Sequence, residues 1–423
     1  MPDLLTELYG ARSYPAMSHP LSDPAVSSVA ALLGGLQVRH PSGARILEIG
    51  CSSGHNLIPL AMRWPNAHFV GIDFSEQAIQ QARDLADVAG LANMEFHAVD
   101  LREFNHDGEP FDFIIAHGFF SWVPDVVKAA LLAFCADHLA PSGIATISFN
   151  AEPGWQARFP VIQKARAIQQ AGAVDEMTAL AILREVTEED SPEIAIIDDM
   201  MAKGQAILPF DDFAPVNDPW SLERFAQAAA EVHLHWLGES DPSMNEASHG
   251  RTFHSAVLCR AEAPRERQVT WAGLQRIFMR LGAVPNESNP VLEVISRAAP
   301  RCLSLEELQA SLPDMERRDL GQRILDGIRR GWILPRIEAV SYDPEPPLRP
   351  ALDPFRLECA RRRLPLVDAW HRPCSFPERH YELLERMNGS LDQEALADFS
   401  ASHCAELDFT PWLGHLAERG MFA

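Results

Sequence analysis

The sequence predicts an α/β protein with a mostly parallel sheet, followed by a mainly helical, winged-helix-like C-terminal region. Over about the first 150 residues, short β-rich apolar runs alternate with longer amphipathic runs, a pattern typical of a parallel sheet with crossover helices. From about residue 263 the periodicity becomes helical. At 423 residues the chain is too long for one hydrophobic core, so we expect several domains.

Seven strands are expected in the N-terminal part. After a helix near residues 26–36, five strands are predicted at residues 45–49, 68–73, 94–99, 111–116 and 144–149, with helices such as 76–89 and 126–139 between them. A helix at 222–232 and a strand pair at 233–238 and 253–259 complete the sheet. The acidic helical stretch at about 159–201 interrupts the pattern, as an insertion that covers a bound substrate or that only packs on the domain.

The C-terminal region contains a weak internal repeat. Helices and a short apolar end at residues 305–337 have counterparts at 381–423, and the proline-rich segment 342–354 lies between them. We therefore expect a first domain at 1–262 with a helical insertion at about 156–215, a winged-helix-like middle domain at 263–341 and a winged-helix-like C-terminal domain at 342–423.

Composition excludes several classes of protein. A net charge of −23 repels phosphate backbones, so nucleic acid is not an expected partner. The N-terminus lacks the pattern of a signal peptide and no stretch is apolar enough to span a bilayer, so we expect a cytoplasmic protein without integral membrane contact. The seven cysteines are scattered without Cys-x-x-Cys spacing, which predicts buried, reduced thiols and no zinc site. No metal is expected at His233-x-His235 either, because further ligands are missing.

The strongest motif runs from Leu47 to Asn56, where a strand is followed at once by a glycine-containing turn and the start of a helix. Gly50 and Gly54 have no Cβ to block the close approach of a ligand, and the N-terminus of the helix presents free N–H groups. A nicotinamide-binding fingerprint is the rival interpretation, but it needs glycine at both Ser52 and His55.

Acids follow three successive strands of the predicted sheet. Glu48 ends the first, Asp73 ends the second and Asp100 follows the third. Because the carboxyl ends of parallel strands form one crevice, these acids are expected to converge on one ligand. Asp73 is placed to accept hydrogen bonds from two ribose hydroxyls, and Asp100 lies where an adenine edge could be read, with Phe74 or Leu101 against its face.

The sequence resembles class I methyltransferases, and more narrowly the bacterial group that carries a methyltransferase regulatory domain, which includes rickettsial-type protein lysine methyltransferases. The resemblance is dense over roughly the first 260 residues. It rests on Tyr14-Pro-Ala-Met-Ser-His-Pro20, on Gly50-Cys-Ser-Ser-Gly54 with Asn56, on Phe111 to Gly118 with Ser121-Trp-Val-Pro124, on Phe149-Asn150 with Pro153-Gly-Trp155, and on Asn217-Asp-Pro219 with Phe225 and Leu237-Gly-Glu239.

This resemblance implies a Rossmann-like domain with a mostly parallel seven-stranded sheet that binds S-adenosyl-L-methionine. It also implies middle and C-terminal helical domains that shape substrate access or form a homodimer. His55 and Phe149 depart from the family pattern, which more often has Gly and Tyr there. The implied cofactor-binding residues are Glu48, Gly50, Cys51, Ser52, Gly54, Asn56, Asp73, Phe74, Asp100, Leu101 and His117.

Four candidates for the reacting centre follow. They are His117 after the fourth strand, Trp122 in the next loop, Asn150 at the end of the fifth strand, and Tyr14 in the N-terminal arm, where His19 is a further candidate. Each also has an ordinary packing or hydrogen-bonding interpretation. Methyl transfer mainly requires alignment, exclusion of water and a neutral nucleophile, so no larger catalytic set is needed.

Three functions remain open from the sequence. The first is methyl transfer to a protein acceptor, with lysine as the acceptor residue. The second is a small-molecule O- or N-methyltransferase of a biosynthetic pathway. The third is a fold that binds S-adenosylmethionine only as a sensor or scaffold.

Overall fold

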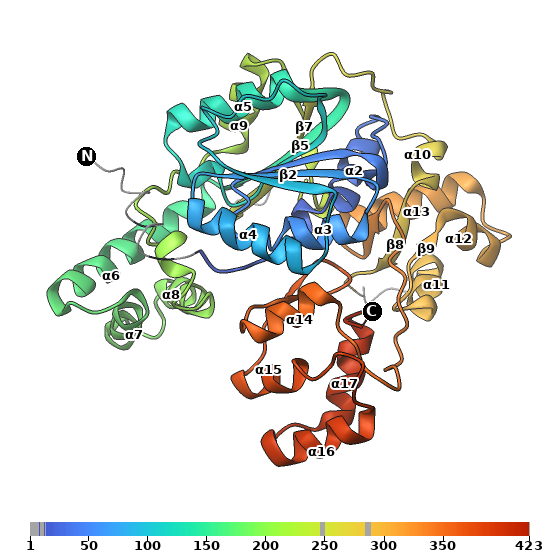
Figure 1. Cartoon of the computed structure of the whole chain (residues 1–423). Helices are drawn as coiled ribbons and strands as arrows, with labels where there is room; N and C mark the ends of the chain where they lie inside the picture. Colours follow the sequence, from blue (N-terminus) through green and yellow to red (C-terminus); the bar gives the residue numbers. More distant parts are fainter. Residues whose placement is uncertain (1–7, 9–11, 13, 246–249, 284–288, 423) are drawn as a thin grey trace.

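The computed structural model describes residues 8, 12, 14–245, 250–283 and 289–422. Its centre is a seven-stranded sheet of order β3-β2-β1-β4-β5-β7-β6 (Figure 1). Strands β1 to β5 pair in parallel. β7 runs antiparallel to both β5 and β6, so β6 at the edge points in the same direction as β1 to β5. The strands are β1 (Arg45–Ile49), β2 (His68–Asp73), β3 (Met94–Ala98), β4 (Phe111–Ala116), β5 (Leu139–Asn150), β6 (Leu234–Glu239) and β7 (Phe253–Arg260).

Helices cover both faces of the sheet because its strands are apolar on both sides. Ile46 packs on the face covered by α2 (Pro24–Leu33), α3 (Leu57–Arg63) and α4 (Glu76–Val88). Its neighbour Leu47 packs on the opposite face, under α5 (Asp125–His138) and α9 (Leu222–Glu231). The predicted mostly parallel, seven-stranded α/β domain is thereby confirmed.

The insertion after β5 is a helical lobe with a core of its own. It contains α6 (Arg158–Gly172), α7 (Glu176–Val186) and α8 (Glu193–Ala202), and lies beside the N-terminal arm (Figure 1). Val161, Leu180 and Ile197 are fully buried in its separate hydrophobic cluster. Arg158 joins the lobe to the segment that leads back to the sheet, through an ion pair with the buried Asp212 at 2.9 Å.

The C-terminal part is mainly helical, as predicted, and its first unit contains a small sheet. Strands β8 (Phe278–Leu281), β9 (Leu303–Ser304) and β10 (Ile333–Arg336) form an antiparallel sheet of order β10-β8-β9. Around it lie α10 (Trp271–Gln275), α11 (Pro290–Ala298), α12 (Leu305–Ser311) and α13 (Arg317–Arg329).

The second C-terminal unit differs from the first in its strands. Its helices are α14 (Pro354–Arg361), α15 (Glu378–Leu384), α16 (Gln393–His403) and α17 (Phe409–Glu418). The repeat predicted an apolar end at 418–423 matching β10, but residues 419–422 contain no strand. The unit instead has a hairpin of β11 (Leu366–Val367) and β12 (Pro373–Cys374), placed before its last three helices. The proline-rich segment 342–354 follows β10 and reaches the start of α14, and its role as a domain linker stays a prediction.

Both C-terminal units share a hydrophobic core with the sheet domain. Buried side chains of α2, α3 and α4 belong to the same cluster as those of α11 to α17, and α14 packs against α4 below the sheet (Figure 1). All seven cysteine side chains are buried, as expected. Within the described part of the chain, no helix combines the length and apolar character needed to cross a membrane.

Candidate functional site

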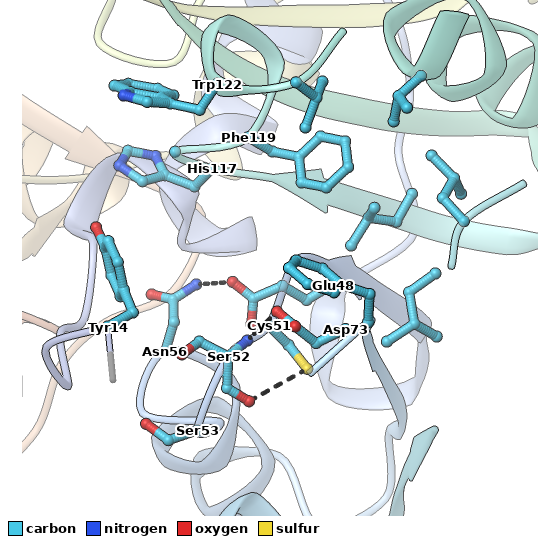
Figure 2. A pocket seen from close by; sticks show the side chains of 18 of the residues that line it. Tyr14, Glu48, Cys51, Ser52, Ser53, Asn56, Asp73, His117, Phe119 and Trp122 are labelled. Carbon is cyan, nitrogen blue, oxygen red and sulfur yellow. Dashed lines mark hydrogen bonds between the residues drawn. The ribbon is translucent and has the colours of Figure 1, made fainter. Parts of the chain in front are cut away.

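The site lies at the carboxyl ends of β1 to β4, where a cavity of about 290 Å³ opens. Its walls come from the N-terminal arm, from the loops after these four strands and from the start of α5 (Figure 2). The cavity therefore occupies the crevice where the acids were predicted to converge.

The loop after β1 approaches the cavity with its backbone. The N–H groups of Gly50 and Cys51 donate to the carbonyl of Ile72 at 2.8 and 3.1 Å, which fixes the loop to β2. Gly50 has φ +75°, and a Cβ there would lie 2.7 Å from the ring of Phe119. Glycine is therefore required at position 50 both by conformation and by space.

Gly54 is required for a different reason from the predicted one. Its φ is +74°, and an added Cβ would lie 2.9 Å from the Phe96 ring and 3.1 Å from Ala82. Gly54 is not among the residues that line the cavity. Its missing side chain permits packing of the loop on β3 and α4, and a direct role toward a ligand stays a prediction.

Asp73 ends β2 and faces the cavity. One carboxylate oxygen accepts the N–H of Ser52 at 3.0 Å and the other accepts the N–H of Ser75 at 2.9 Å. Burial raises the pKa of Asp73, and the two backbone bonds oppose that rise. Each oxygen retains a lone pair, so the carboxylate can still accept two hydroxyl donors.

Glu48 is more buried than Asp73, and its pKa is shifted strongly upward. Its side chain is buried, and Oε1 accepts a hydrogen bond from Asn56 Nδ2 at 2.6 Å. Oε2 has no hydrogen-bond partner among the described residues. Burial raises the pKa of Glu48 to about 8, against the lowering effect of Asn56. A buried, unsatisfied carboxyl oxygen of this kind fits a cationic ligand group.

The residues expected around adenine belong to the loops after β2 and β3. Phe74, Leu101 and Asp100 all line it. The Asp100 carboxylate is bound by Arg102, whose Nε and Nη2 donate at 2.9 and 2.6 Å. Phe74 is 42% exposed, which leaves its ring accessible from the cavity. The predicted contact of Asp100 with an adenine edge would therefore share the carboxylate with Arg102.

His117 and Trp122 form the wall across the cavity from the acids (Figure 2). Within the part of the chain that the structure describes, His117 Nδ1 and Trp122 Nε1 are buried and without a hydrogen-bond partner. The His117 ring stacks on His19, with centroids 3.9 Å apart. Burial lowers the pKa of His19 to about 4 and places that of His117 well below its usual range, so both rings are neutral near pH 7.

Tyr14 closes the side of the cavity formed by the N-terminal arm. Its ring packs edge-on against Phe210 at 5.4 Å, and burial, with a contribution from Asp211, raises its pKa to about 12. Arg12 bonds to Glu176 at 3.3 Å, which ties the same arm to the helical lobe. Tyr14 therefore faces the cavity as a neutral phenol.

Asn150 does not face the cavity. Its side-chain amide donates to Asn217 at 3.0 Å and its backbone N–H donates to Ser121 at 2.8 Å. It is absent from the cavity lining, so these bonds support a structural role at the base of the insertion. Phe149 is also structural, because its ring stacks on Phe225 at 4.4 Å.

His55 avoids crowding the loop. It is not among the non-glycine residues with positive φ, and its ring packs 5.2 Å from Phe355 of α14 with Nε2 3.4 Å from Cys359. The remaining predicted cofactor residues Cys51, Ser52 and Asn56 all line the cavity.

Some residues of the site were missed by the sequence analysis. Phe119 and Val127 line the cavity next to predicted residues, and their nearness to His117 and Pro124 was a usable signal. His371 was also missed, although its Nε2 lies 2.8 Å from Asn56 Oδ1. No local pattern marks a histidine 315 positions away as part of this site.

Comparisons with known proteins agree with this geometry. A family model described as a methyltransferase domain matches residues 46–143. An uncharacterised protein of Rickettsia prowazekii is 39% identical over 147 residues, 35% of this chain and 27% of the relative. Trans-aconitate 2-methyltransferase of Streptomyces coelicolor is 35% identical over 100 residues, 23% of this chain and 32% of the relative. The chain thus spans only about a third or less of the length of these two relatives.

The solved structure of PKMT2 from Rickettsia typhi in complex with AdoHcy matches with a TM-score of 0.82. The match covers 97% of this chain and 99% of that chain at 15% sequence identity. At this identity the likeness establishes the fold, including the helical lobe and both C-terminal units, and nothing finer.

Proposed function

We propose that the chain uses S-adenosylmethionine to methylate a protein acceptor at lysine. Residues 46–143 match a methyltransferase domain, which supports the reaction class. The observation that carries the proposal is the desolvated wall formed by His19 and His117, where burial disfavours a positive charge. This wall lies beside the predicted cofactor site. The agreement in fold with PKMT2, whose name denotes a protein lysine methyltransferase, supports it over the whole chain.

The residues present fit the cofactor. Glu48, with its unsatisfied oxygen, and the cradle at Gly50 would hold the amino acid end, and Asp73 would accept from the ribose. When bound, S-adenosylmethionine supplies a methyl group that is already activated on a sulfonium. The protein then has to exclude water, align the acceptor and keep it neutral.

A lysine acceptor must lose a proton before it can attack. Its reference pKa near 10.4 leaves about one amine in a thousand neutral at pH 7.4, a cost of roughly 4 kcal/mol. Desolvation in the cavity wall keeps His19 and His117 neutral. The same desolvation would lower the pKa of a lysine placed beside them. His117 Nδ1 and Trp122 Nε1 remain available to contact the incoming side chain.

Small polyanionic acceptors fit the cavity less well. Among the described residues that line it, Arg102 is the one permanently cationic side chain, and it is bound to Asp100. Of the three acids in the lining, Asp100 is paired with Arg102, and burial keeps most Glu48 carboxyls protonated near pH 7. An acceptor such as trans-aconitate would therefore meet no free cation there, whereas a lysine that loses its proton on entry brings no charge into the desolvated wall.

The test uses methyl-labelled S-adenosylmethionine, the purified protein and a lysate of its own organism. We expect label in the protein fraction, located on lysine by mass spectrometry, and a rate that rises with pH as lysine deprotonates. Asp73→Ala should weaken S-adenosylmethionine binding at least tenfold, while Asp87→Ala on the exposed side of α4 should not.

Two other outcomes would replace the proposal. Label found only in small molecules would favour a biosynthetic O- or N-methyltransferase. Cofactor binding without label in either fraction would favour a sensor or scaffold. Unchanged affinity in Asp73→Ala would remove the assignment of the cofactor site itself.

A further inference from the structure

A turn of the last C-terminal unit contacts a residue that lines the cofactor site. It connects β11 to β12 and carries His371, whose side chain is fully buried at φ +63°. His371 Nε2 lies 2.8 Å from Oδ1 of Asn56, in the loop between β1 and α3. Segments 315 positions apart in sequence therefore meet next to Glu48.

The turn is held by a dense set of bonds within its own unit. Asp368 is buried, and one of its oxygens accepts the N–H groups of Trp370 and Arg372 at 2.9 and 2.8 Å. The other oxygen accepts from the side chains of Arg372 and Arg419. His371 is thus presented at a fixed position before any ligand arrives.

The hydrogen bonds around Asn56 fix its orientation and the tautomer of His371. The backbone N–H of His19 donates to Asn56 Oδ1 at 2.8 Å, so this atom is the acceptor. His371 Nε2 must then carry the proton and donate to the same oxygen. The amide nitrogen of Asn56 points the other way and donates to Glu48 Oε1 at 2.6 Å and to Ser22 Oγ at 2.9 Å.

We propose that His371 is a positioning residue of the cofactor site, which orients Asn56 so that Glu48 presents its free oxygen to the amino acid end of S-adenosylmethionine. The C-terminal unit thereby becomes part of the cofactor site without touching the cavity: His371 is not among its lining residues. The inference rests on the proposed cofactor site and adds a dependence on a distant unit. By linkage, cofactor binding and the seating of this turn stabilise each other.

The environment of His371 keeps the donor in place. Burial lowers its pKa to about 3, and the charged or titratable groups that face it include Asp23, Arg63, Arg336, His19 and His117. The neutral Nε2–H tautomer is therefore the form present across the physiological range.

The unit is also anchored independently of His371. α14 of the same unit packs against α4, and Arg63 of α3 is fixed within the sheet domain by its ion pair with the buried Asp23 at 2.7 Å. Arg63 also donates to the carbonyl of Ala369 at 3.2 Å. A substitution at His371 should accordingly leave the turn docked and change mainly the bond to Asn56.

The experiment measures S-adenosylmethionine dissociation constants by calorimetry for the full chain and a matched pair of variants. His371→Gln places an amide N–H near the position of Nε2, whereas His371→Asn is one methylene shorter and cannot reach Asn56. We expect binding about tenfold weaker in His371→Asn and within about threefold of wild type in His371→Gln. His403→Ala, on the exposed face of α16, is the control and should bind as wild type.

A double-mutant cycle separates positioning from general stability. If His371 acts through Asn56, then combining Asn56→Ala with His371→Asn should weaken binding no more than Asn56→Ala alone. Melting temperatures without cofactor show whether the variants fold alike. Equal affinity in His371→Asn and wild type, or additive effects in the cycle, would overturn the proposal. Wild-type protein that fails to bind S-adenosylmethionine would instead overturn the cofactor site on which it rests.

Discussion

Replacing Glu48 by glutamine is expected to abolish a proton release that accompanies S-adenosylmethionine binding. Burial raises the pKa of the Glu48 carboxyl to about 8 in the free protein. At pH 7 about nine in ten of these carboxyls therefore hold a proton. A cationic ammonium next to the unsatisfied Oε2 favours the ionised form and displaces that proton.

The magnitude depends on pH in a defined direction. Release should be about 0.9 proton per cofactor at pH 7 and should fall toward about 0.1 at pH 9, where the free carboxyl is already ionised. Between pH 4.5 and 8 the native state holds a proton that the unfolded chain has lost, so without cofactor Glu48 costs stability as pH rises through this window. Bound S-adenosylmethionine should remove most of that cost.

Calorimetric titration in buffers with different ionisation enthalpies measures the proton count directly. Glu48→Gln keeps the shape and the bond from Asn56 but has no proton to release, and Glu109→Gln in an exposed loop is the control. Equal release in Glu48→Gln and wild type would refute the assignment of the proton to Glu48. A wild type that releases no proton at pH 7 would refute the raised pKa.

Three further expectations follow from the described side chains. Gly90 has φ +68° and open space around it, so Gly90→Ala should lower the free energy of unfolding in urea by about 1 kcal/mol. Gly50→Ala should lower it by about 2–4 kcal/mol, because the added methyl group would also lie 2.7 Å from a ring. Equal losses in the two variants would contradict the steric argument. Trp122→Phe should lower kcat about 2- to 10-fold and leave the cofactor dissociation constant unchanged, and an unchanged kcat would show that the indole N–H does not act on the acceptor. Burial lowers the pKa of His19 to about 4 and that of His371 to about 3, so between pH 6.5 and 5 only the unfolded chain protonates these rings. The free energy of unfolding should therefore fall by about 1.5 kcal/mol for each histidine over this range. A His19→Gln variant with the same dependence of stability on pH as wild type would contradict this.

The sheet and the acids at its edge could be predicted because their signals are local. Strands β1, β2 and β4 have the bounds that the apolar runs predicted, and the alternation of strands and helices predicted a mostly parallel sheet. Glu48 and Asp73 each lie at a strand end, so position along the chain also gave position in space.

Asn150 and Gly54 show where local signals are ambiguous. Both lie next to strand ends or turns of the site, yet the Asn150 amide bonds to Asn217 and the space at Gly54 is taken by Phe96. Sequence position places a residue at the correct edge of the sheet, but the direction of its side chain depends on partners from other segments. That dependence is why the lining of the cavity could be predicted only in part.

The packing of the C-terminal units against the sheet domain could not be predicted from the sequence. Their helices were visible as periodic runs, but periodicity says nothing about which surface they meet. The contact is polar and specific: Arg336 pairs with buried Asp23, Trp64 Nε1 donates to Glu338 at 2.9 Å, and His371 donates to Asn56. Breaking one such pair leaves a buried group unsatisfied, so the units cannot be separated from the sheet domain without disturbing the arm and the loop that form the cofactor site. A truncated domain ending near residue 262 should therefore not be treated as the complete cofactor site.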